Sequence, residues 1–236
     1  MRKWMEIIIG MHLLLSGCTT NEGKELIKPE KEKVFMSNEL NELLLQAAKH
    51  GEVNTIKELV KQGANINVQD SQGRTSVMIA TYQNDTATVK ALIELGADVN
   101  IQDKMKNSPF LYAGAEGYLE ILKLTIKAGA DPAITNRFGG TALIPASEHG
   151  YIEVIEELLE NTDIDVNHVN NLGWTALMEA IILNNGNQTQ QQVVQILIEH
   201  GADVNIPDHN HVTPLQHAQQ KGFTEIVEIV VKAGGK

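Results

Sequence analysis

A short run of small and polar residues returns along this chain at a nearly fixed interval, and this repetition constrains the fold more than any other feature. The sequence Gly-Ala-Asp-Val-Asn at 96–100 has near-copies at residue 63, which is 33 residues earlier, at residue 129, which is 33 residues later, and at residue 201. A period in this range is typical of repeat proteins, in which one supersecondary unit is stacked many times. We therefore expect a row of similar units rather than one central core.

Each unit also carries an apolar stripe that predicts an amphipathic helix. A mostly apolar set at positions i, i+3 and i+4 recurs in every unit, as in Ile56, Leu59 and Val60. This spacing places the three side chains on one face of a helix. Upstream of this stripe, a Thr or Ser recurs that is suited to cap another helix of the same unit. In two units Pro follows it, and Pro is tolerated in the first helical turn. The units align on Ala47, Ala80, Ala113, Ala146, Ala180 and Ala218.

These features follow the order turn, helix, short loop, antiparallel helix and Gly-Ala-Asp, with Thr-Pro-Leu before the first helix as at 213–215. This order is the pattern of the ankyrin repeat. The chain resembles that family from about residue 37 to its end. The resemblance implies an all-α ankyrin repeat solenoid of about six helix-turn-helix repeats with short β-hairpin fingers. The expected repeats are residues 37–69, 70–102, 103–135, 136–169, 170–207 and 208–236, with the first and last acting as polar caps.

Two units depart from the pattern. In the fourth unit, residues 161–167 replace the Gly-Ala-Asp turn and add a residue. The fifth unit has about five extra residues within 184–192, which are predicted to lengthen the loop between its helices. A longer polar loop costs little free energy, so the sequence is compatible both with a tolerated insertion and with a contact loop.

The amino-terminal residues predict export. Arg2 and Lys3 precede an apolar run at 7–15, and the sequence Leu-Ser-Gly-Cys follows at 15–18. This arrangement indicates a secretory signal, because a membrane-spanning helix needs about 20 apolar residues. Residues 15–18 resemble the lipobox of bacterial lipoproteins, in which the cysteine is acylated and becomes the first residue of the mature chain. An ordinary signal peptide with a chance cysteine is the alternative.

The lipobox resemblance implies three segments. Residues 1–17 are a lipoprotein signal peptide, residues 18–36 are a flexible tether from acylated Cys18, and residues 37–236 are the repeat domain. The tether assignment follows from its polar, mixed-charge composition. The expected localisation is the cell membrane or periplasm, with the protein lipid-anchored on the extracytoplasmic side.

The sequence offers little for catalysis or for cofactor binding. We find no phosphate-binding loop, no Gly-x-Ser-x-Gly elbow and no His-Glu-x-x-His, and Cys18 is the only cysteine. We expect no enzymatic activity and no cofactor. The net charge of −11 disfavours nucleic acid as a partner, because nucleic-acid binding depends on cations that neutralise phosphates. An extracytoplasmic enzyme with no recognisable motif remains an alternative.

Histidines suggest a second alternative, a metal or haem carrier. Imidazole is a common metal ligand, and the candidates are His168, His209 and His211. However, His209 and His211 lie in a predicted turn, where polar residues are expected in any case.

Protein binding is the function that the distribution of apolar residues favours. Phe138 and Trp174 lie on successive predicted finger tips, and Met105 and Leu172 share the position of Phe138 in the adjoining units. In the ankyrin family the fingers and the inner helices form a concave binding surface. The resemblance therefore implies that the monomer binds a protein partner, identity unknown, through Arg74, Tyr82, Met105, Phe138, Leu172 and Trp174.

We expect these side chains to form an apolar anchor, with Tyr82 on the exposed face of a first helix and acidic groups such as Glu116 and Glu148 around it. The alternative is that the tip side chains fold back onto neighbouring fingers. By analogy at the level of the family, the expected role is that of an inhibitor, immunity protein or companion of an envelope protein.

Overall fold

The computed structural model describes the backbone of residues 29–236 and the side chains from residue 36 onward. The chain divides into two units at residue 36, and the description below concerns the second, residues 36–236. The predicted signal peptide, Cys18 and residues 18–28 of the predicted tether lie outside the described residues. The remainder of the predicted tether is helical, because helix α2 begins at Pro29.

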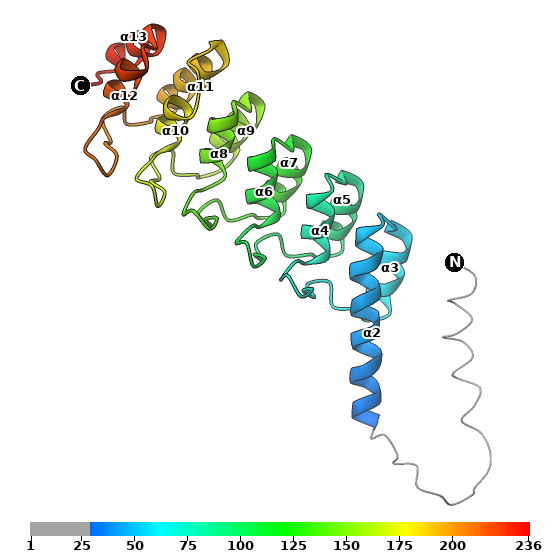
Figure 1. Ribbon diagram of the computed structural model, residues 1–236. Coiled ribbons are helices and arrows are strands. Elements are labelled where there is room, and N and C mark those ends of the chain that lie inside the picture. The colour runs from blue at the N-terminus through cyan, green and yellow to red at the C-terminus, as the bar shows by residue number, and fades with distance from the viewer. Residues whose placement is uncertain (1–28) are drawn as a thin grey trace, which may run out of the picture. The chain divides into compact units, whose positions relative to one another are not determined.

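Six pairs of antiparallel helices follow one another along the chain and lie side by side in Figure 1. The described residues form twelve helices and no strand, which confirms the all-helical solenoid. The first helices of the pairs are α2 (Pro29–Lys49), α4 (Ser76–Tyr82), α6 (Pro109–Glu116), α8 (Leu143–His149), α10 (Ala176–Ile182) and α12 (Pro214–Lys221). The second helices are α3 (Val53–Lys61), α5 (Thr86–Glu94), α7 (Leu119–Lys127), α9 (Ile152–Asn161), α11 (Gln188–Glu199) and α13 (Thr224–Lys232).

The expectation of β-hairpin fingers was wrong in one respect. The fingers are hairpin turns closed by two backbone hydrogen bonds. One joins the first residue to the fifth, as from Asp70 N–H to the Arg74 carbonyl, and one joins the fourth to the first, as from Gly73 N–H to the Asp70 carbonyl, both at 2.9 Å. A turn of five residues is too short to build a ladder of paired strands. None of the described helices is both long enough and apolar enough to cross a membrane.

Most first helices begin at the predicted caps. The hydroxyl oxygens of Thr75, Ser108 and Thr175 each accept a hydrogen bond from the backbone N–H three residues later. Thr213 does the same and Gln216 completes a capping box. Thr141 is an exception, because α8 starts one residue later and the Thr141 hydroxyl is buried without a partner among the described residues.

One continuous apolar core runs between the helix pairs. The aligned alanines Ala80, Ala113, Ala146, Ala180 and Ala218 are fully buried, as are the predicted stripe residues Ile56, Leu92 and Ile155. The small residues allow neighbouring first helices to approach closely. At Gly114 of α6, an added Cβ would lie only 2.8 Å from the Cβ of Ala142 in the next unit. The close approach of these two units therefore leaves no room for a side chain at Gly114.

Asparagines in the recurring turn join most of the units to the next one. The side-chain oxygen of Asn100 accepts a hydrogen bond from the Asp131 N–H, and its amide donates to the Gly129 carbonyl. Asn167 and Asn205 make the same pair of bonds with the turn that follows each of them. The third unit has Ala133 at this position and can make neither bond. In the turn of the fourth unit, Thr162 stands in place of the glycine. Its hydroxyl donates a hydrogen bond to the Leu158 carbonyl and accepts one from the Ile164 N–H, so both bonds form within the fourth unit.

The extra residues of the fifth unit pack against the unit before them. Asn184 and Gln190 both donate side-chain hydrogen bonds to the Glu148 carbonyl at the end of α8, at 2.9 and 3.2 Å, and Gln190 is buried. Gln83 makes a similar bond to the Lys49 carbonyl at the junction between the first and second units. The insertion thus has a structural role within the chain, since it satisfies a carbonyl at a helix end.

Candidate functional site

The fingers project from one end of the helix pairs (Figure 1), and one polar side chain shapes each of them. The first residue of every finger is Asp or Asn, and its side-chain oxygen accepts hydrogen bonds from the N–H groups two and four residues later. The bond lengths lie between 2.8 and 3.1 Å, and the residues are Asp70, Asp103, Asn136, Asn170 and Asp208. This Asx-type turn presents the third residue of the finger at its tip.

Three successive tips carry exposed apolar side chains, which we call the apolar tip row. Met105 is 49% exposed, Phe138 is 53% exposed and Leu172 is 53% exposed. These side chains therefore do not fold back into the stack. Backbone bonds join two pairs of fingers, from Lys104 N–H to the Gln72 carbonyl and from Asn171 N–H to the Phe138 carbonyl, both at 2.9 Å.

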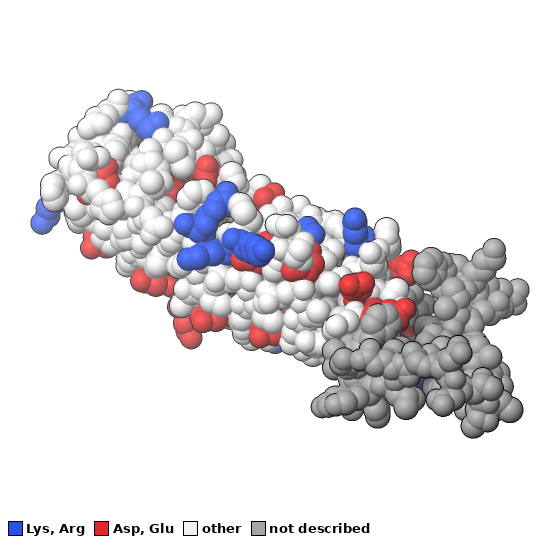
Figure 2. Space-filling view, turned by 60° about the horizontal axis from the view of Figure 1, so that its bottom comes forward, with Lys and Arg blue, Asp and Glu red and all other residues white. Residues whose placement is uncertain are grey.

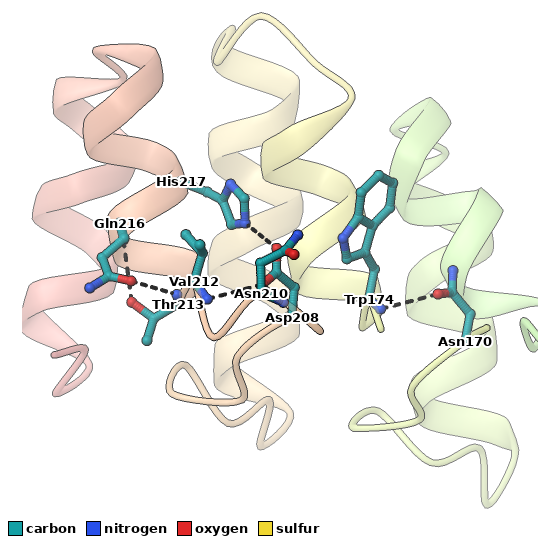
Figure 3. A network of polar contacts seen from close by, with 8 residues as sticks. All are labelled: Asn170, Trp174, Asp208, Asn210, Val212, Thr213, Gln216 and His217. Atoms are coloured by element: carbon teal, nitrogen blue, oxygen red, sulfur yellow. Dashed lines mark hydrogen bonds and ion pairs between the residues drawn. The ribbon is translucent and has the colours of Figure 1, made fainter. Parts of the chain in front are cut away.

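Trp174 differs from its neighbours because it is half-buried. Trp174 lies two residues after the tip residue Leu172, and its backbone N–H donates a hydrogen bond to the Asn170 side chain (Figure 3). Gly173 before it has a φ of +83°, and a Cβ there would lie 2.9 Å from the backbone nitrogen of His209 in the next finger. The fourth and fifth fingers consequently pack closely, and Trp174 beside this contact is only partly exposed.

Three of the predicted partner-binding residues surround one hollow. Its volume is about 230 Å³, and the lining residues are Gln72, Arg74, Tyr82, Asp103 and Met105. The Arg74 guanidinium is paired with Asp70 of the same finger at 2.7 Å, and the Arg74 side chain remains 41% exposed. The hollow is thus lined by an arginine paired with Asp70, by the apolar side chain of Met105, and by the Tyr82 phenol beside Asp103.

Tyr82 is held more firmly than the sequence predicted. Its hydroxyl donates to Asp103 at 2.5 Å and accepts from the Asn107 amide at 2.9 Å, while its ring packs edge-on against Tyr112. Burial raises the pKa of Tyr82 to about 12; the Asp103 carboxylate adds to this rise and the bond from Asn107 opposes it. Tyr82 is thus only partly exposed on its helix, and its side chain links the second unit to the third.

A buried carboxylate on an inner helix escaped the sequence prediction. Glu179 of α10 is only 6% exposed and accepts a hydrogen bond from Asn170 at 2.7 Å. Burial raises the pKa of Glu179 to about 7; the charge of Glu148 adds to the rise and the bond from Asn170 opposes it. The sequence signal that could have revealed this residue is its position directly before the core alanine Ala180.

The charge around the apolar tip row is opposite to the expectation. Glu116 is exposed on the inner helix α6 and Glu148 is partly exposed on α8, but the fingers themselves carry Lys104, Lys106 and Arg137, all exposed. Figure 2, in which the bottom of Figure 1 comes forward, shows a group of Lys and Arg side chains near the middle of that face. The immediate surroundings of Met105 and Phe138 are therefore cationic.

The structure does not assemble the candidate histidines. The Nε2 atom of His168 lies 2.6 Å from the Gly139 carbonyl, and His209 and His211 are exposed on a single finger. No group of three or more His, Cys, Asp or Glu side chains within the described part of the chain could hold a metal ion.

Another histidine forms a side-chain contact with the first residue of its finger, which the sequence did not predict. His217 contacts Asp208 at 3.0 Å (Figure 3). Burial raises the pKa of Asp208, but the hydrogen bonds from Val212 N–H and His217 outweigh it, so the pKa lies below its usual value. Asp208 therefore has the same turn-forming task as the first residue of every other finger.

Comparisons with known proteins agree with this architecture. Two family models match: "Ankyrin repeats (3 copies)" over residues 12–103 and 110–208, and "Ankyrin repeats (many copies)" over residues 187–231. A crystal structure of an ankyrin repeat domain from Acinetobacter baumannii AYE is similar at 48% identity and a TM-score of 0.80, over 82% of this chain and 98% of that one. The ankyrin repeat protein EF0377 is similar at 42% identity and a TM-score of 0.78, over 81% of this chain and 98% of that one.

A curated relative, the putative ankyrin repeat protein YahD of Escherichia coli K12, is 48% identical over 80 residues. The match spans 34% of this chain and 40% of the length of YahD. Ankyrin repeats are a protein–protein interaction module, and proteins built from them are typically binding modules without enzymatic activity. With its helix pairs, turns and fingers in register over most of its length, the chain belongs to the ankyrin repeat family.

Proposed function

We propose that this protein is a lipid-anchored component of the bacterial cell envelope that binds a partner protein through its fingers and inner helices, as an inhibitor, immunity protein or companion. The observation that carries the binding part is the apolar tip row, in which Met105, Phe138 and Leu172 stand exposed on three successive fingers. Aligned apolar side chains on a protein surface mark interaction sites, because their burial by a partner removes them from water.

The rigidity of the fingers supports the same proposal. The Asx-type turns and the two backbone bonds between fingers hold the tips in place before a partner arrives. A preorganised surface loses less conformational entropy on binding, which favours affinity. Arg74, Tyr82 and Trp174 would then contribute at the edges of the contact, where they are partly exposed.

The proposed anchor rests on Cys18 and the residues before it. Acylation of Cys18 would hold the protein at a membrane surface, since each buried CH₂ group contributes about 0.8 kcal/mol and two or more chains make anchoring stable. Anchoring would limit the choice of partners to proteins of the envelope. The bacterial origin of the similar proteins from Acinetobacter baumannii and Escherichia coli fits a bacterial lipoprotein.

The two alternative functions have weaker support. For a metal or haem carrier, His168 is already engaged by the Gly139 carbonyl and the other two histidines lie on a different finger. For an enzyme, the strongly perturbed carboxyl group of Glu179 is buried and does not line the hollow beside Tyr82. No specific observation favours either function over protein binding.

Crosslinking in intact cells, followed by mass spectrometry of the captured proteins, tests the proposal. We expect one envelope protein to be captured by the natural protein and lost from the double variant Phe138→Ala/Leu172→Ala. The matched control is Val231→Ala, which removes a side chain that is 52% exposed on α13, away from the fingers. Equal capture by all three proteins would contradict the binding surface.

A further inference from the structure

The fingers carry free positive charge in a chain whose net charge is −11. Lys104, Lys106 and Arg137 are exposed on the second and third fingers, and none of them forms an ion pair with a described carboxylate. Two of them are the chain neighbours of Met105, and the Arg137 guanidinium lies 4.5 Å from the centre of the Phe138 ring. Cations and exposed apolar side chains therefore alternate along these tips.

The carboxylates of the fingers are already occupied. Asp70 is paired with Arg74, Asp103 accepts the Tyr82 hydroxyl, and Asp208 is paired with His217. Within the described structure, no finger carboxylate remains to neutralise the three exposed cations. A partner that covers this surface must supply the negative charge, because a cation removed from water without a counter-charge costs free energy.

The hollow beside Tyr82 adds a place for one side chain. Its volume of about 230 Å³ exceeds the roughly 150 Å³ cavity that accommodates a benzene molecule. Arg74 lines it and bonds Asp70 through Nε and Nη2. An arginine has five N–H donors, so Arg74 retains donors for a second carboxylate. Met105 supplies an apolar wall beside them.

We propose that the fingers 70–74, 103–107 and 136–140 bind an acidic segment of the partner protein. One side chain of this segment enters the hollow beside Arg74, its carboxylates face Lys104, Lys106 and Arg137, and its apolar groups cover Met105 and Phe138. The inference rests on the proposed protein-binding function and adds the chemistry of the partner.

A narrow segment fits this surface better than an anionic bilayer or a nucleic acid. Charges in solution are screened over about 8 Å at physiological ionic strength, so a segment that touches only these tips responds mainly to their three cations. A broad anionic surface also faces Glu116, Glu148 and the many other acids of the chain, and the net charge of −11 repels it. A flat surface would moreover leave the hollow unfilled.

Selection of displayed random-sequence peptides on the purified protein tests the inference. We expect the enriched peptides to contain more Asp and Glu than the starting library and to bind more weakly as salt is added. The triple variant Lys104→Glu/Lys106→Glu/Arg137→Glu should bind the selected peptides at least about tenfold more weakly, because each lost surface ion pair also becomes a repulsion. The matched control Lys57→Glu/Lys61→Glu/Lys127→Glu, which reverses exposed charges on α3 and α7, should bind them within about twofold of the natural protein.

Two results would overturn the inference. One is a selection that yields no binding peptides or peptides without an acidic excess. The other is tighter, charge-dependent binding of the same protein to phosphatidylglycerol vesicles or to a single-stranded oligonucleotide. If Phe138→Ala/Leu172→Ala still abolished crosslinking in cells, the protein-binding function would stand and only the acidic partner would be wrong. Failure of both experiments would remove the proposed function as well.

Discussion

The side-chain oxygen of Asn100 accepts a hydrogen bond of 2.8 Å from the backbone N–H of Asp131, the corresponding turn of the next unit. The amide of the same asparagine donates to the Gly129 carbonyl at 3.1 Å. One side chain therefore satisfies a donor and an acceptor in the turn that follows α7. The last residue of the recurring sequence is thus a link between units.

We predict that Asn100→Ala destabilises the protein by about 1–2 kcal/mol, because two hydrogen bonds between units are lost and each contributes roughly 0.5–1.5 kcal/mol net. The free energy of unfolding in urea measures this change. Asn54→Ala provides the control, since Asn54 is exposed on α3 and its side chain makes no hydrogen bond with the described residues. Equal stability of the two variants would show that the asparagine links contribute nothing.

Glu179 predicts a dependence of stability on pH. The folded protein keeps the Glu179 proton up to a pH of about 7, whereas the unfolded chain loses it near the ordinary value of 4.5. Between these values the folded state binds more protons, so this residue lowers the free energy of unfolding as the pH rises from 4.5 to about 7. The destabilisation is complete above that range and absent below it.

Glu179→Gln removes the charge and keeps the acceptor for Asn170. We expect this variant to be more stable than the natural protein by about 1–3 kcal/mol near pH 8 and equally stable near pH 4. Thermal unfolding of both proteins across this pH range provides the measurement. A stability difference that did not change with pH would mean that the pKa of Glu179 is the same in the folded and unfolded states.

Tyr82→Phe tests the link between the second and third units. The ring can still pack on Tyr112, but Asp103 and Asn107 lose their shared partner, so we expect a loss of about 1–2 kcal/mol. Tyr118→Phe serves as the control, because the Tyr118 hydroxyl makes no hydrogen bond with the described residues. Denaturation midpoints that shifted equally in both variants would argue against the network.

Cys18→Ser tests the proposed anchor. Without the thiol no acyl chain can be attached, and we expect the protein to move from the membrane fraction to the soluble fraction of lysed cells. Thr19→Ser keeps the cysteine and should leave the protein in the membrane fraction. Continued sedimentation of Cys18→Ser with the membranes would exclude lipidation as the means of attachment.

The sequence by itself determined the repeat and its register. The spacing of the recurring alanines, the stripe residues such as Ile56, and the caps Thr75 and Thr213 all act over a few neighbouring positions along the chain. Backbone geometry converts such local spacing directly into helices and turns, which is why the helix pairs and the finger positions were predictable. The same register placed Met105, Phe138 and Leu172 at the finger tips, but their exposure was established only by the structure.

Only the tertiary structure decided how side chains of different units pair. Asp103 accepts a hydrogen bond from the Tyr82 hydroxyl of the unit before it. In the fifth unit, an extra residue donates a hydrogen bond to the Glu148 carbonyl of the unit before it. Glu179 is buried by packing around its helix, and Thr141 loses its role as a cap. Contacts of this kind join groups far apart along the chain, and their geometry depends on how units stack. A local pattern therefore cannot specify which polar groups become buried, which stay free, and what charge the binding surface carries.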